Sequence, residues 1–290
     1  MTGLLQLSEQ VAAALAEGRP VVALETSIVG QGLPSPHNLE AARGCEAAIR
    51  DEGAVPATVA VLDGRLRVGL GDAELERIAS GAVKVSSRDL GPALAQGWVG
   101  ATTVAATMRI ASMAGIRFFA TGGIGGVHRG HPEDQSADLE ELGHTAVAVF
   151  CAGAKIILDI SSTLERLDSL AVPVLGYGCD EFPSFYSRHG QGRVSRVDGP
   201  EEAARVLRAA WATGARGVVV AIPPPRELEG AQRMAEQAVR ELSDVHGGDV
   251  TPRLLARMAE LSSGRSVTLN VELVINNART AARVARVYSP

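Results

Sequence analysis

The sequence predicts an α/β protein with three layers, α/β/α, around a mixed central β-sheet. Short apolar runs alternate with segments of helical character along the chain, which is the pattern of strands alternating with helices. Two apolar runs are joined across Asp63-Gly64, a dipeptide typical of a tight hairpin, and a hairpin makes the sheet mixed. No linker-like stretch or repeat divides the chain. We therefore expect one domain spanning residues 1–290.

We expect residues 4–18 to form an amphipathic helix. The segment contains Glu9 and Glu17 and lacks the basic leader of a signal peptide. A buried strand, Pro20–Glu25, and a helix, His37–Gly53, follow. The later expectations are a hairpin over Ala57–Leu70, a helix over 71–80, a helix over Thr102–Gly115 capped by Thr102 or Thr103, and a strand running into a glycine-rich loop over 116–123.

The second half continues the alternation. We expect a helix over 136–143, a strand over 145–151, a helix over 161–170 capped by Ser161 or Ser162, a strand over 172–178, a helix over 200–214, a strand over 216–222 stopped by three prolines, and mostly helix from Glu227 onwards.

Composition limits the classes of function. The net charge is −5 and the pI is near 5.7, which argues against a nucleic-acid or anionic-membrane binder, since both need a basic excess. Three widely spaced cysteines fit a reducing cytosol better than a disulfide framework. No apolar run reaches the roughly 18 residues of a membrane span. These features predict a soluble, cytoplasmic protein.

Lysine is scarce. The 28 basic residues include only two lysines, Lys84 and Lys155, and 26 arginines. Genomic bias accounts for the scarcity but not for these two positions. An amine that must lose its proton cannot be replaced by arginine, which stays charged at any accessible pH.

Candidate chemical groups follow predicted strands, where α/β sheets place their sites. Glu25 ends a strand and suits a general acid, although a capping or ion-paired glutamate is the simpler interpretation of that position alone. Lys155 lies in an apolar stretch, where a lysine is rarely found without a reason, so we favour a nucleophilic amine. Lys84 also follows an apolar run and suits anion binding or a role beside the second amine.

The glycine-rich loop Thr121–Gly130 follows a strand, and its N–H groups could cradle a phosphate with Arg129 as a charge partner, although a flexible loop is equally compatible. It matches no nucleotide-binding motif. His128 and His131 near Asp134 could hold at most a weak, oxygen-rich divalent site, and a solvated polar loop is the simpler interpretation. Together with two rare lysines and a carboxylate, the loop suggests Schiff-base chemistry on a phosphorylated sugar.

A resemblance to a known family makes this more specific. The segments ALETS-x4-GLPSPHNLEAA, K-x3-RDL, GATTVAAT, FATGGIGGVHRG, D-x-SADL, CAGAK-x2-LDI and DEFPSFY occur in this order, and the C-terminal half adds TPRLLARMAELSSG and N-x4-INNA. The chain thereby resembles the pseudouridine-5'-phosphate glycosidase (indigoidine synthase A-like) family over nearly its whole length. Family members are three-layer α/β trimers that use a divalent metal, usually manganese, and break or form the C–C bond between ribose 5-phosphate and uracil.

The resemblance implies a role for each matching residue. Lys155 would form an imine with C1' of the opened sugar, and Glu25 would donate a proton. Asp134 would hold Mn²⁺ or another divalent cation. The remaining implied pocket residues bind substrate: Lys84, Val104, His128, Ser136, Ala137, Asp138 and Asn277.

The chemistry explains why these residue types are needed. A C-glycoside has no heteroatom to protonate at the bond that breaks. Cleavage therefore needs a proton for the ring carbon and stabilisation of the electron-deficient sugar carbon, which a lysine supplies by forming an iminium. In synthesis the same imine presents the sugar to a carbon nucleophile.

Three positions depart from the pattern of the hydrolytic members: Gln31 stands where a histidine is usual, Ile222 replaces an asparagine, and Glu272 replaces a small residue. The implied catalytic residues are kept, so we expect retained sugar chemistry with an altered ring pocket. This favours a C-glycosynthase that joins ribose 5-phosphate to an aromatic polyketide in antibiotic biosynthesis. Hydrolysis of pseudouridine 5'-phosphate to uracil is the alternative.

Two hypotheses from other classes remain. A Schiff-base aldolase or isomerase would act on the sugar phosphate itself, and trapping with ribose 5-phosphate followed by product analysis would identify it. A sugar-phosphate-binding module would turn nothing over, and it could use arginine at both lysine positions.

Overall fold

A mixed β-sheet forms the centre of the molecule in the computed structural model, which describes residues 3–242 and 250–288. The strands lie in the order β1 (Leu5–Leu7), β4 (Arg65–Val68), β3 (Val55–Leu62), β2 (Val21–Leu24), β7 (Phe118–Ala120), β10 (Ala148–Cys151), β16 (Val218–Ala221), β12 (Val174–Tyr177) and β15 (Ser195–Val197), with β6 (Gly100–Thr102) beside β3 and β5 (Val83–Val85) beside β6. The run from β3 through β2 to β15 is parallel.

The predicted hairpin is one of two antiparallel pairings that make the sheet mixed, the other being β3 with β6. Strands β3 and β4 pair antiparallel, with Leu62 opposite Arg65. Both turn residues, Asp63 and Gly64, have positive φ values of 51° and 73°, the conformation of the tight turn that the Asp-Gly dipeptide favours.

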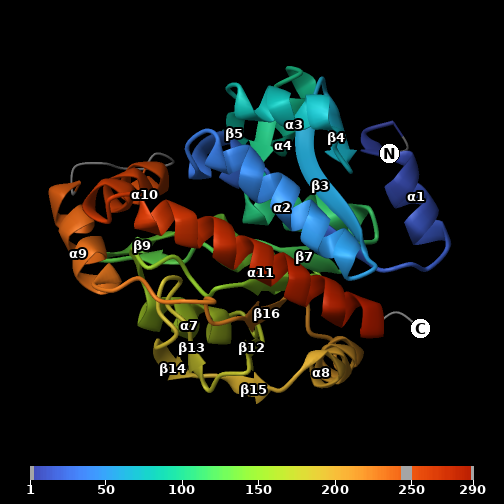
Figure 1. Cartoon of the computed structure of the whole chain (residues 1–290). Helices are drawn as coiled ribbons and strands as arrows, with labels where there is room; N and C mark the ends of the chain where they lie inside the picture. Colours follow the sequence, from blue (N-terminus) through green and yellow to red (C-terminus); the bar gives the residue numbers. More distant parts are fainter. Residues whose placement is uncertain (1–2, 243–249, 289–290) are drawn as a thin grey trace.

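Helices cover both faces of the sheet. They are α1 (Glu9–Ala16), α2 (His37–Asp51), α3 (Asp72–Ala79), α4 (Leu90–Ala95), α5 (Val104–Met113), α6 (Ala137–His144), α7 (Ile160–Ser169), α8 (Pro200–Ala212), α9 (Ala231–Glu241), α10 (Val250–Leu261) and α11 (Arg265–Tyr288). The long helix α11 crosses one face of the sheet between α2 and α8 (Figure 1), while α5, α6 and α7 pack in sequence on the other face. The three-layer α/β/α prediction is confirmed.

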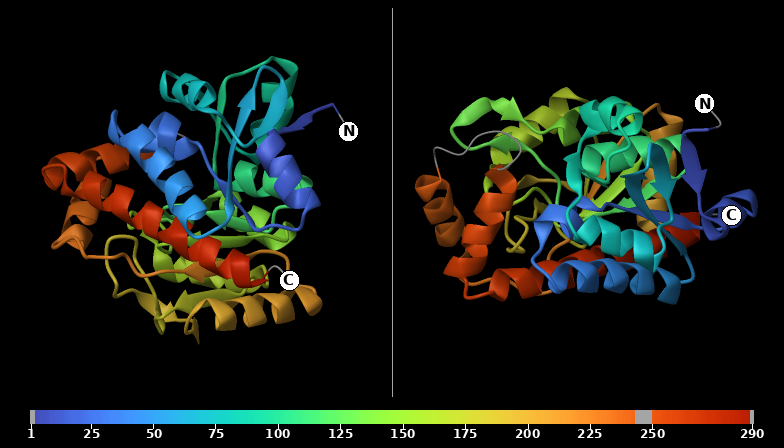
Figure 2. Two further views of the ribbon diagram at one scale, coloured as in Figure 1. Left: turned by 45° about the vertical axis from the view of Figure 1, so that its right-hand side comes forward. Right: turned by 90° about the horizontal axis from the view of Figure 1, so that it is seen from above.

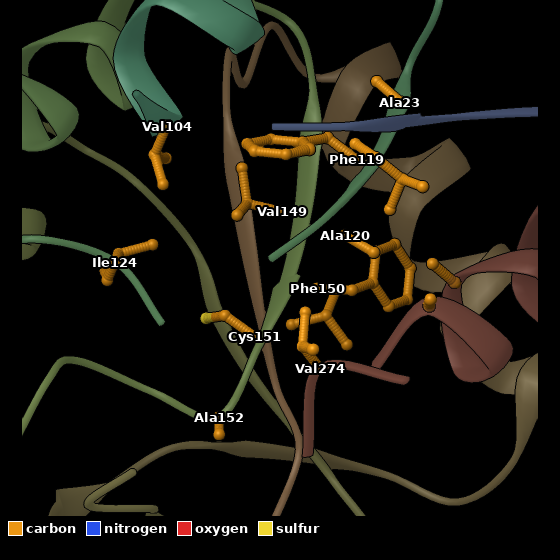
Figure 3. Packing of buried hydrophobic residues seen from close by; sticks show 14 of the residues in the cluster. Ala23, Val104, Phe119, Ala120, Ile124, Val149, Phe150, Cys151, Ala152 and Val274 are labelled. Atoms are coloured by element: carbon orange, nitrogen blue, oxygen red, sulfur yellow. The ribbon is translucent and has the colours of Figure 1, made fainter. Parts of the chain in front are cut away.

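The core lies between these layers and follows the period-two alternation of the strands. Phe119 and Val149 lie side by side toward Val104 of α5, whereas Ala120 and Phe150 lie toward Val274 of α11 (Figure 3). All of them are buried. Both faces of the central strands are therefore apolar, and polar chemistry is left to the strand ends.

Two of the expected boundaries are wrong. Residues 5–7 form strand β1 beside β4, and helix α1 starts only after Ser8, whose side chain caps it by accepting from the Val11 N–H. Helix α7 is capped by Asp159, which accepts from Ser162 N–H at 2.9 Å, rather than by Ser161 or Ser162. The cap of α5 is Thr103, one of the two residues expected.

Two small sheets were not expected from the sequence. They are formed by β8 (Val127–His128), β9 (His131–Gln135) and β11 (Leu158–Asp159), and by β13 (Glu181–Phe182) and β14 (Gln191–Arg193). At one end of the molecule α9 and α10 pack together beside the start of α11 (Figure 2). None of the described helices is long and apolar enough to cross a membrane.

Candidate active site

A pocket opens where the parallel strands β2, β7 and β10 end at their carboxyl side, the position at which α/β sheets bind ligands. The loops after these strands, the π-helical turn Ile28–Gly32, β5, α10 and the start of α11 form its walls. The residues that line it are Glu25, Ser27, Ile28, Gln31, Gly32, Lys84, Thr121, Gly122, Gly123, Lys155, Phe185, Pro252, Leu255 and Asn270.

Glu25 follows β2 directly and is partly buried. Burial raises the pKa of its carboxyl group above the ordinary value of 4.5, while the charge of Lys155 and hydrogen bonds from Ser27 and Thr121 oppose that rise. Ser27 Oγ donates to one carboxylate oxygen and Thr121 Oγ1 to the other. These contacts fix the position of the carboxyl group at the pocket wall. Burial, which raises the pKa, favours the protonated form that a general acid needs.

The backbone after Glu25 is anchored below the pocket. Thr26, which is fully buried, donates its hydroxyl to the Val59 carbonyl at 2.8 Å and accepts from the Thr102 N–H at 2.9 Å. The turn that carries Glu25 is thus attached to β3 and β6.

Lys155 reaches the same pocket from the loop after β10. The backbone N–H of Lys155 donates to the Ile124 carbonyl at 3.2 Å, and the backbone N–H of Ile124 donates to the Gly153 carbonyl at 3.1 Å. Gly153 has a φ of +81°, and a Cβ there would lie 2.0 Å from the Pro183 carbonyl oxygen. Only glycine fits that bend, which directs the chain so that Lys155 reaches the pocket.

Lys84 and Gln31 lie on the wall formed by β5 and the π-helical turn. The Gln31 side-chain N–H₂ donates to the Ala82 carbonyl at 2.6 Å. The two rare lysines therefore line one pocket, as the sequence suggested, and Gln31 is the one of the three departing positions that lines it.

The other two departing positions lie elsewhere. Ile222 is buried at the end of β16, and Glu272 on α11 makes a bidentate ion pair with Arg226, with both N···O distances at 2.6 Å. Neither lines the pocket around Lys155.

The Ser136-Ala137-Asp138 turn supports the pocket from behind. Asp138 is buried, and its two carboxylate oxygens accept from Ala105 N–H at 2.9 Å and from Gly125 N–H at 2.8 Å. It thereby ties the start of α5 to the glycine-rich loop. Ser136 caps α6, and Ala137 is exposed at its first position.

Val104 and Asn277 are likewise outside the pocket lining. Val104 is buried at the first position of α5. Asn277 is also buried, and its side-chain nitrogen donates to the Thr121 carbonyl at 2.8 Å and to the Gly122 carbonyl at 3.4 Å. Asn277 thus holds the glycine-rich loop on α11.

The glycine-rich loop does not use Arg129 as a charge partner for the pocket. The Arg129 guanidinium donates to the Leu158 and Ile156 carbonyls at 2.9 and 2.7 Å, and it lines a separate cavity. Its contacts hold the loop to β11 instead.

The manganese prediction is wrong for this structure. In residues 3–242 and 250–288, no three or more His, Cys, Asp or Glu side chains are grouped so that they could hold a metal ion. The Asp134 carboxylate lies 3.3 Å from His128 Nδ1, and His131 lies beside Glu133 instead, so the donors form separate pairs. The residues present therefore do not fit a protein-held cation.

Sequence reasoning did not single out the lining residues Ser27, Phe185 and Asn270, and it named Thr121 only as the start of the glycine-rich loop. Thr121 directly follows β7, so the rule that sites lie at strand ends could have found it. Asn270 lies seven residues before Asn277, two helical turns away on the same face. Ser27 and Phe185 carry no comparable signal.

Comparison with known proteins identifies the family to which this chain is similar. Residues 10–287 match the family described as indigoidine synthase A like protein. The chain is 52% identical to a pseudouridine-5'-phosphate glycosidase of a Nocardioides species, over 99% of this chain and 97% of that protein. It is also 52% identical to the pseudouridine-5'-phosphate glycosidase of Deinococcus radiodurans, over 98% and 95% of the two chains.

Two solved structures share the fold. The prealnumycin C-glycosynthase AlnA in complex with ribulose 5-phosphate superposes with a TM-score of 0.91 at 39% identity, covering 99% of this chain and 97% of that one. An indigoidine synthase A-like protein from Thermotoga maritima superposes with a TM-score of 0.88 at 31% identity, over 98% and 96% of the two chains.

Proposed function

We propose, because this chain belongs to the indigoidine synthase A-like family, that it is an enzyme that makes or breaks the C–C bond between ribose 5-phosphate and an aromatic ring through an imine of Lys155. The observation that carries the proposal is the pocket in which Lys155, Lys84 and Glu25 meet. An amine, a second cation for an anionic substrate and a carboxyl group with a raised pKa are the groups that this reaction requires.

In the cleavage direction the sugar ring opens first. The bond between C1' and the ring oxygen breaks, the amine nitrogen of Lys155 bonds to C1', and the released oxygen takes up a proton. The bond between C1' and the aromatic ring then breaks. Its electron pair leaves with the carbon of the aromatic ring, while the nitrogen lone pair forms the iminium with C1'. Glu25 donates a proton to that ring carbon. Water hydrolyses the iminium and releases ribose 5-phosphate and the free amine.

The other groups position the substrate. Lys84 lies on the pocket wall as a cation for an anionic sugar phosphate. Asp138 and Asn277 act through the glycine-rich loop that they hold, rather than through direct contact with the ring. Val104, Ser136, Ala137 and His128 remain proposed substrate contacts on the strength of the family resemblance.

Two rings compete as the partner of the sugar. Uracil is supported by the 52% identity to pseudouridine-5'-phosphate glycosidases. An aromatic polyketide, as in antibiotic biosynthesis, is supported by the superposition on the prealnumycin C-glycosynthase and by the departure at Gln31. Both share the chemistry at Lys155.

The direct test is turnover in both directions. Pseudouridine 5'-phosphate should release uracil and ribose 5-phosphate, and the reverse mixture should form the C–C bond, with both reactions lost in Lys155→Ala. Conversion of ribose 5-phosphate alone into another sugar phosphate would instead identify an aldolase or isomerase.

Assembly and location are further parts of the proposal. The family resemblance supports a homotrimer, and the three widely spaced cysteines support a reducing cytoplasm. Analytical ultracentrifugation of the purified chain tests the trimer.

A further inference from the structure

Glu25 lines two cavities. One is the pocket that contains Lys155, and the other is a small cavity of about 10 Å³ between the central sheet and helices α2 and α11. That volume is room for about one water molecule. Figure 1 shows α2 and α11 side by side on this face of the sheet, and Figure 3 shows Ala120 turned toward Val274 there. The residues that line the small cavity besides Glu25 are Leu24, Ile28, Ala41, Ala42, Cys45, Thr58, Ala120 and Val274.

The register of three parallel strands places the floor of the small cavity. Leu24 on β2 lies opposite Thr58 on β3 and opposite Ala120 on β7, so these three side chains share one face of the sheet. Cys45 reaches the same space from α2, and all four residues are buried. Glu25 follows Leu24 and borders this space at the end of β2. One side of Glu25 is thus enclosed by protein.

Thr58 carries the one side-chain hydroxyl group among the described residues that line the small cavity. A hydroxyl group has a single hydrogen to donate, and that of Thr58 is donated to Glu46 Oε1 at 2.6 Å. Glu46 on α2 is only 8% exposed, and its other carboxylate oxygen accepts from Arg50 at 3.0 Å. The Thr58 hydrogen is therefore directed at Glu46 and is not available to Glu25.

The carboxyl group of Glu25 accepts its side-chain hydrogen bonds from the walls of the other cavity. Ser27 and Thr121, which donate to its two oxygens, both line the pocket that contains Lys155. Each carboxylate oxygen can accept a second hydrogen bond. A donor on the side of the small cavity would stabilise the carboxylate relative to the acid and so lower the pKa of Glu25. Among the described residues that line it, the small cavity offers Glu25 no free hydroxyl hydrogen.

We propose that Glu46 is a positioning residue for the proton donor Glu25, because it binds the hydroxyl hydrogen of Thr58 and thereby leaves the small-cavity side of Glu25 without a hydroxyl donor. The inference rests on the proposed function, in which Glu25 donates a proton to the ring carbon. Neither Glu46 nor Thr58 lines the pocket that contains Lys155, so both act through Glu25 rather than on the substrate.

Several charged or titratable groups surround Glu25. Lys155 from the loop after β10 lowers the pKa of Glu25, and Asp138 from α6 raises it. The charge of Glu25 in turn contributes to the raised pKa of the Cys45 thiol on α2. Lys84 lines the pocket from β5. The three charged groups are kept in every variant of the test, so they do not account for a change in the pKa of Glu25.

Substitutions at Glu46 separate its hydrogen bond from its charge. Glu46→Met removes the acceptor and frees the Thr58 hydrogen, so we expect the pKa of Glu25 to fall by about one pH unit. On the alkaline limb of the kcat profile that fall lowers the rate about tenfold. Glu46→Gln keeps an acceptor oxygen without the charge and should keep the wild-type pKa of Glu25. Glu46→Met combined with Thr58→Val removes the freed hydroxyl group and should restore that pKa.

The pKa of Glu25 is measured without substrate. The infrared carbonyl band of the protonated carboxyl group is followed against pH and is identified as the band missing from Glu25→Gln. The pH profile of kcat for cleavage of pseudouridine 5'-phosphate is a second readout. Glu40→Met, at an exposed position of the same helix as Glu46, is the matched control and should change neither readout. Cys45→Ser adds a hydroxyl group to the small cavity with Glu46 unchanged and should lower the pKa as Glu46→Met does.

The outcomes are distinct. An unchanged pKa of Glu25 in folded Glu46→Met would overturn the inference. Equal falls in Glu46→Met and Glu46→Gln would also overturn it, because the charge of Glu46 would then be the cause, and so would a fall that the added Thr58→Val does not reverse. Where Glu46→Met does not fold, an unchanged pKa in Cys45→Ser overturns the inference instead. The infrared readout needs no substrate, so failure of the proposed function shows separately, as the absence of both cleavage and imine trapping in the wild type.

Discussion

Glu25 and Lys155 line the same pocket from the ends of β2 and β10, two strands separated by β7. The charge of Lys155 is the strongest of the effects that lower the pKa of Glu25, yet burial outweighs it and the pKa stays raised. The proton donor and the amine therefore share one pocket without a hydrogen bond between their side chains.

Replacing Glu25 by glutamine should remove the proton donor and keep the shape of the side chain. We expect kcat for cleavage to fall by about 100- to 10,000-fold, the usual contribution of general acid catalysis. In the wild type the rate should fall as the pH rises through the raised pKa of Glu25, because the deprotonated carboxylate cannot donate. A pH profile of kcat measures both effects, and a Glu25→Gln enzyme of near wild-type rate would remove Glu25 from the mechanism.

The same carboxyl group should make folding stability pH-dependent. Because the pKa of Glu25 is raised in the folded state, the native protein binds the proton more tightly than the unfolded chain does. The contribution of Glu25 to the free energy of unfolding is therefore complete below its ordinary pKa of 4.5. That contribution is lost as the pH rises through the raised pKa. Glu25→Gln lacks this loss, so its Tm should rise relative to that of the wild type as the pH increases above 4.5. A difference in Tm that does not change with pH above 4.5 would contradict the assignment.

Gly153 should be required for both stability and activity. An alanine there combines a φ of +81° with a Cβ 2.0 Å from the Pro183 carbonyl oxygen, and we expect a loss of at least about 3 kcal/mol in unfolding free energy. Gly178→Ala is the matched control, because its φ is +69° but nothing lies within 4 Å, so only the strain of about 1 kcal/mol applies. Denaturant titration compares the two, and equal losses would show that the contact with Pro183 is unimportant.

Asp138→Asn should weaken the support of the glycine-rich loop. An amide has one acceptor oxygen where the carboxylate uses two, so either Ala105 N–H or Gly125 N–H loses its partner. We expect a cost of about 1–3 kcal/mol in unfolding free energy and a lower kcat, since the loop borders the pocket. Asp168→Asn on the exposed side of α7 should change the unfolding free energy by less than about 0.5 kcal/mol. A stable Asp138→Asn enzyme with full activity would refute the role in loop support.

The sequence predicted the layered fold well because most of its signals are local. The Asp63-Gly64 turn needs two positive φ values, and the Thr103 cap needs one side chain beside the helix start. The errors arise where distant partners decide the structure. Residues 5–7 form a strand because β4 offers a free edge, and β11 joins the local β8–β9 hairpin from about thirty residues further along the chain.

The candidate site was predictable in part for a similar reason. Glu25 and Lys155 follow apolar strands, and the strand-end rule brings such residues to one edge of the sheet. Asn277 was expected in the pocket, but it holds backbone carbonyls, whereas Asn270 two turns earlier lines the pocket. Residue type does not distinguish these two asparagines, because the difference lies in what α11 packs against.

The imine at Lys155 can be captured by reduction. The enzyme is incubated with ribose 5-phosphate, reduced with borohydride and digested, and the modified peptide is identified by mass spectrometry. With only two lysines in the chain, Lys155 and Lys84 are readily distinguished. We predict one adduct, on Lys155, which is absent in Lys155→Arg even though the positive charge is kept. An adduct on Lys84 alone, or a Lys155→Arg enzyme that still makes or breaks the C–C bond, would contradict the account.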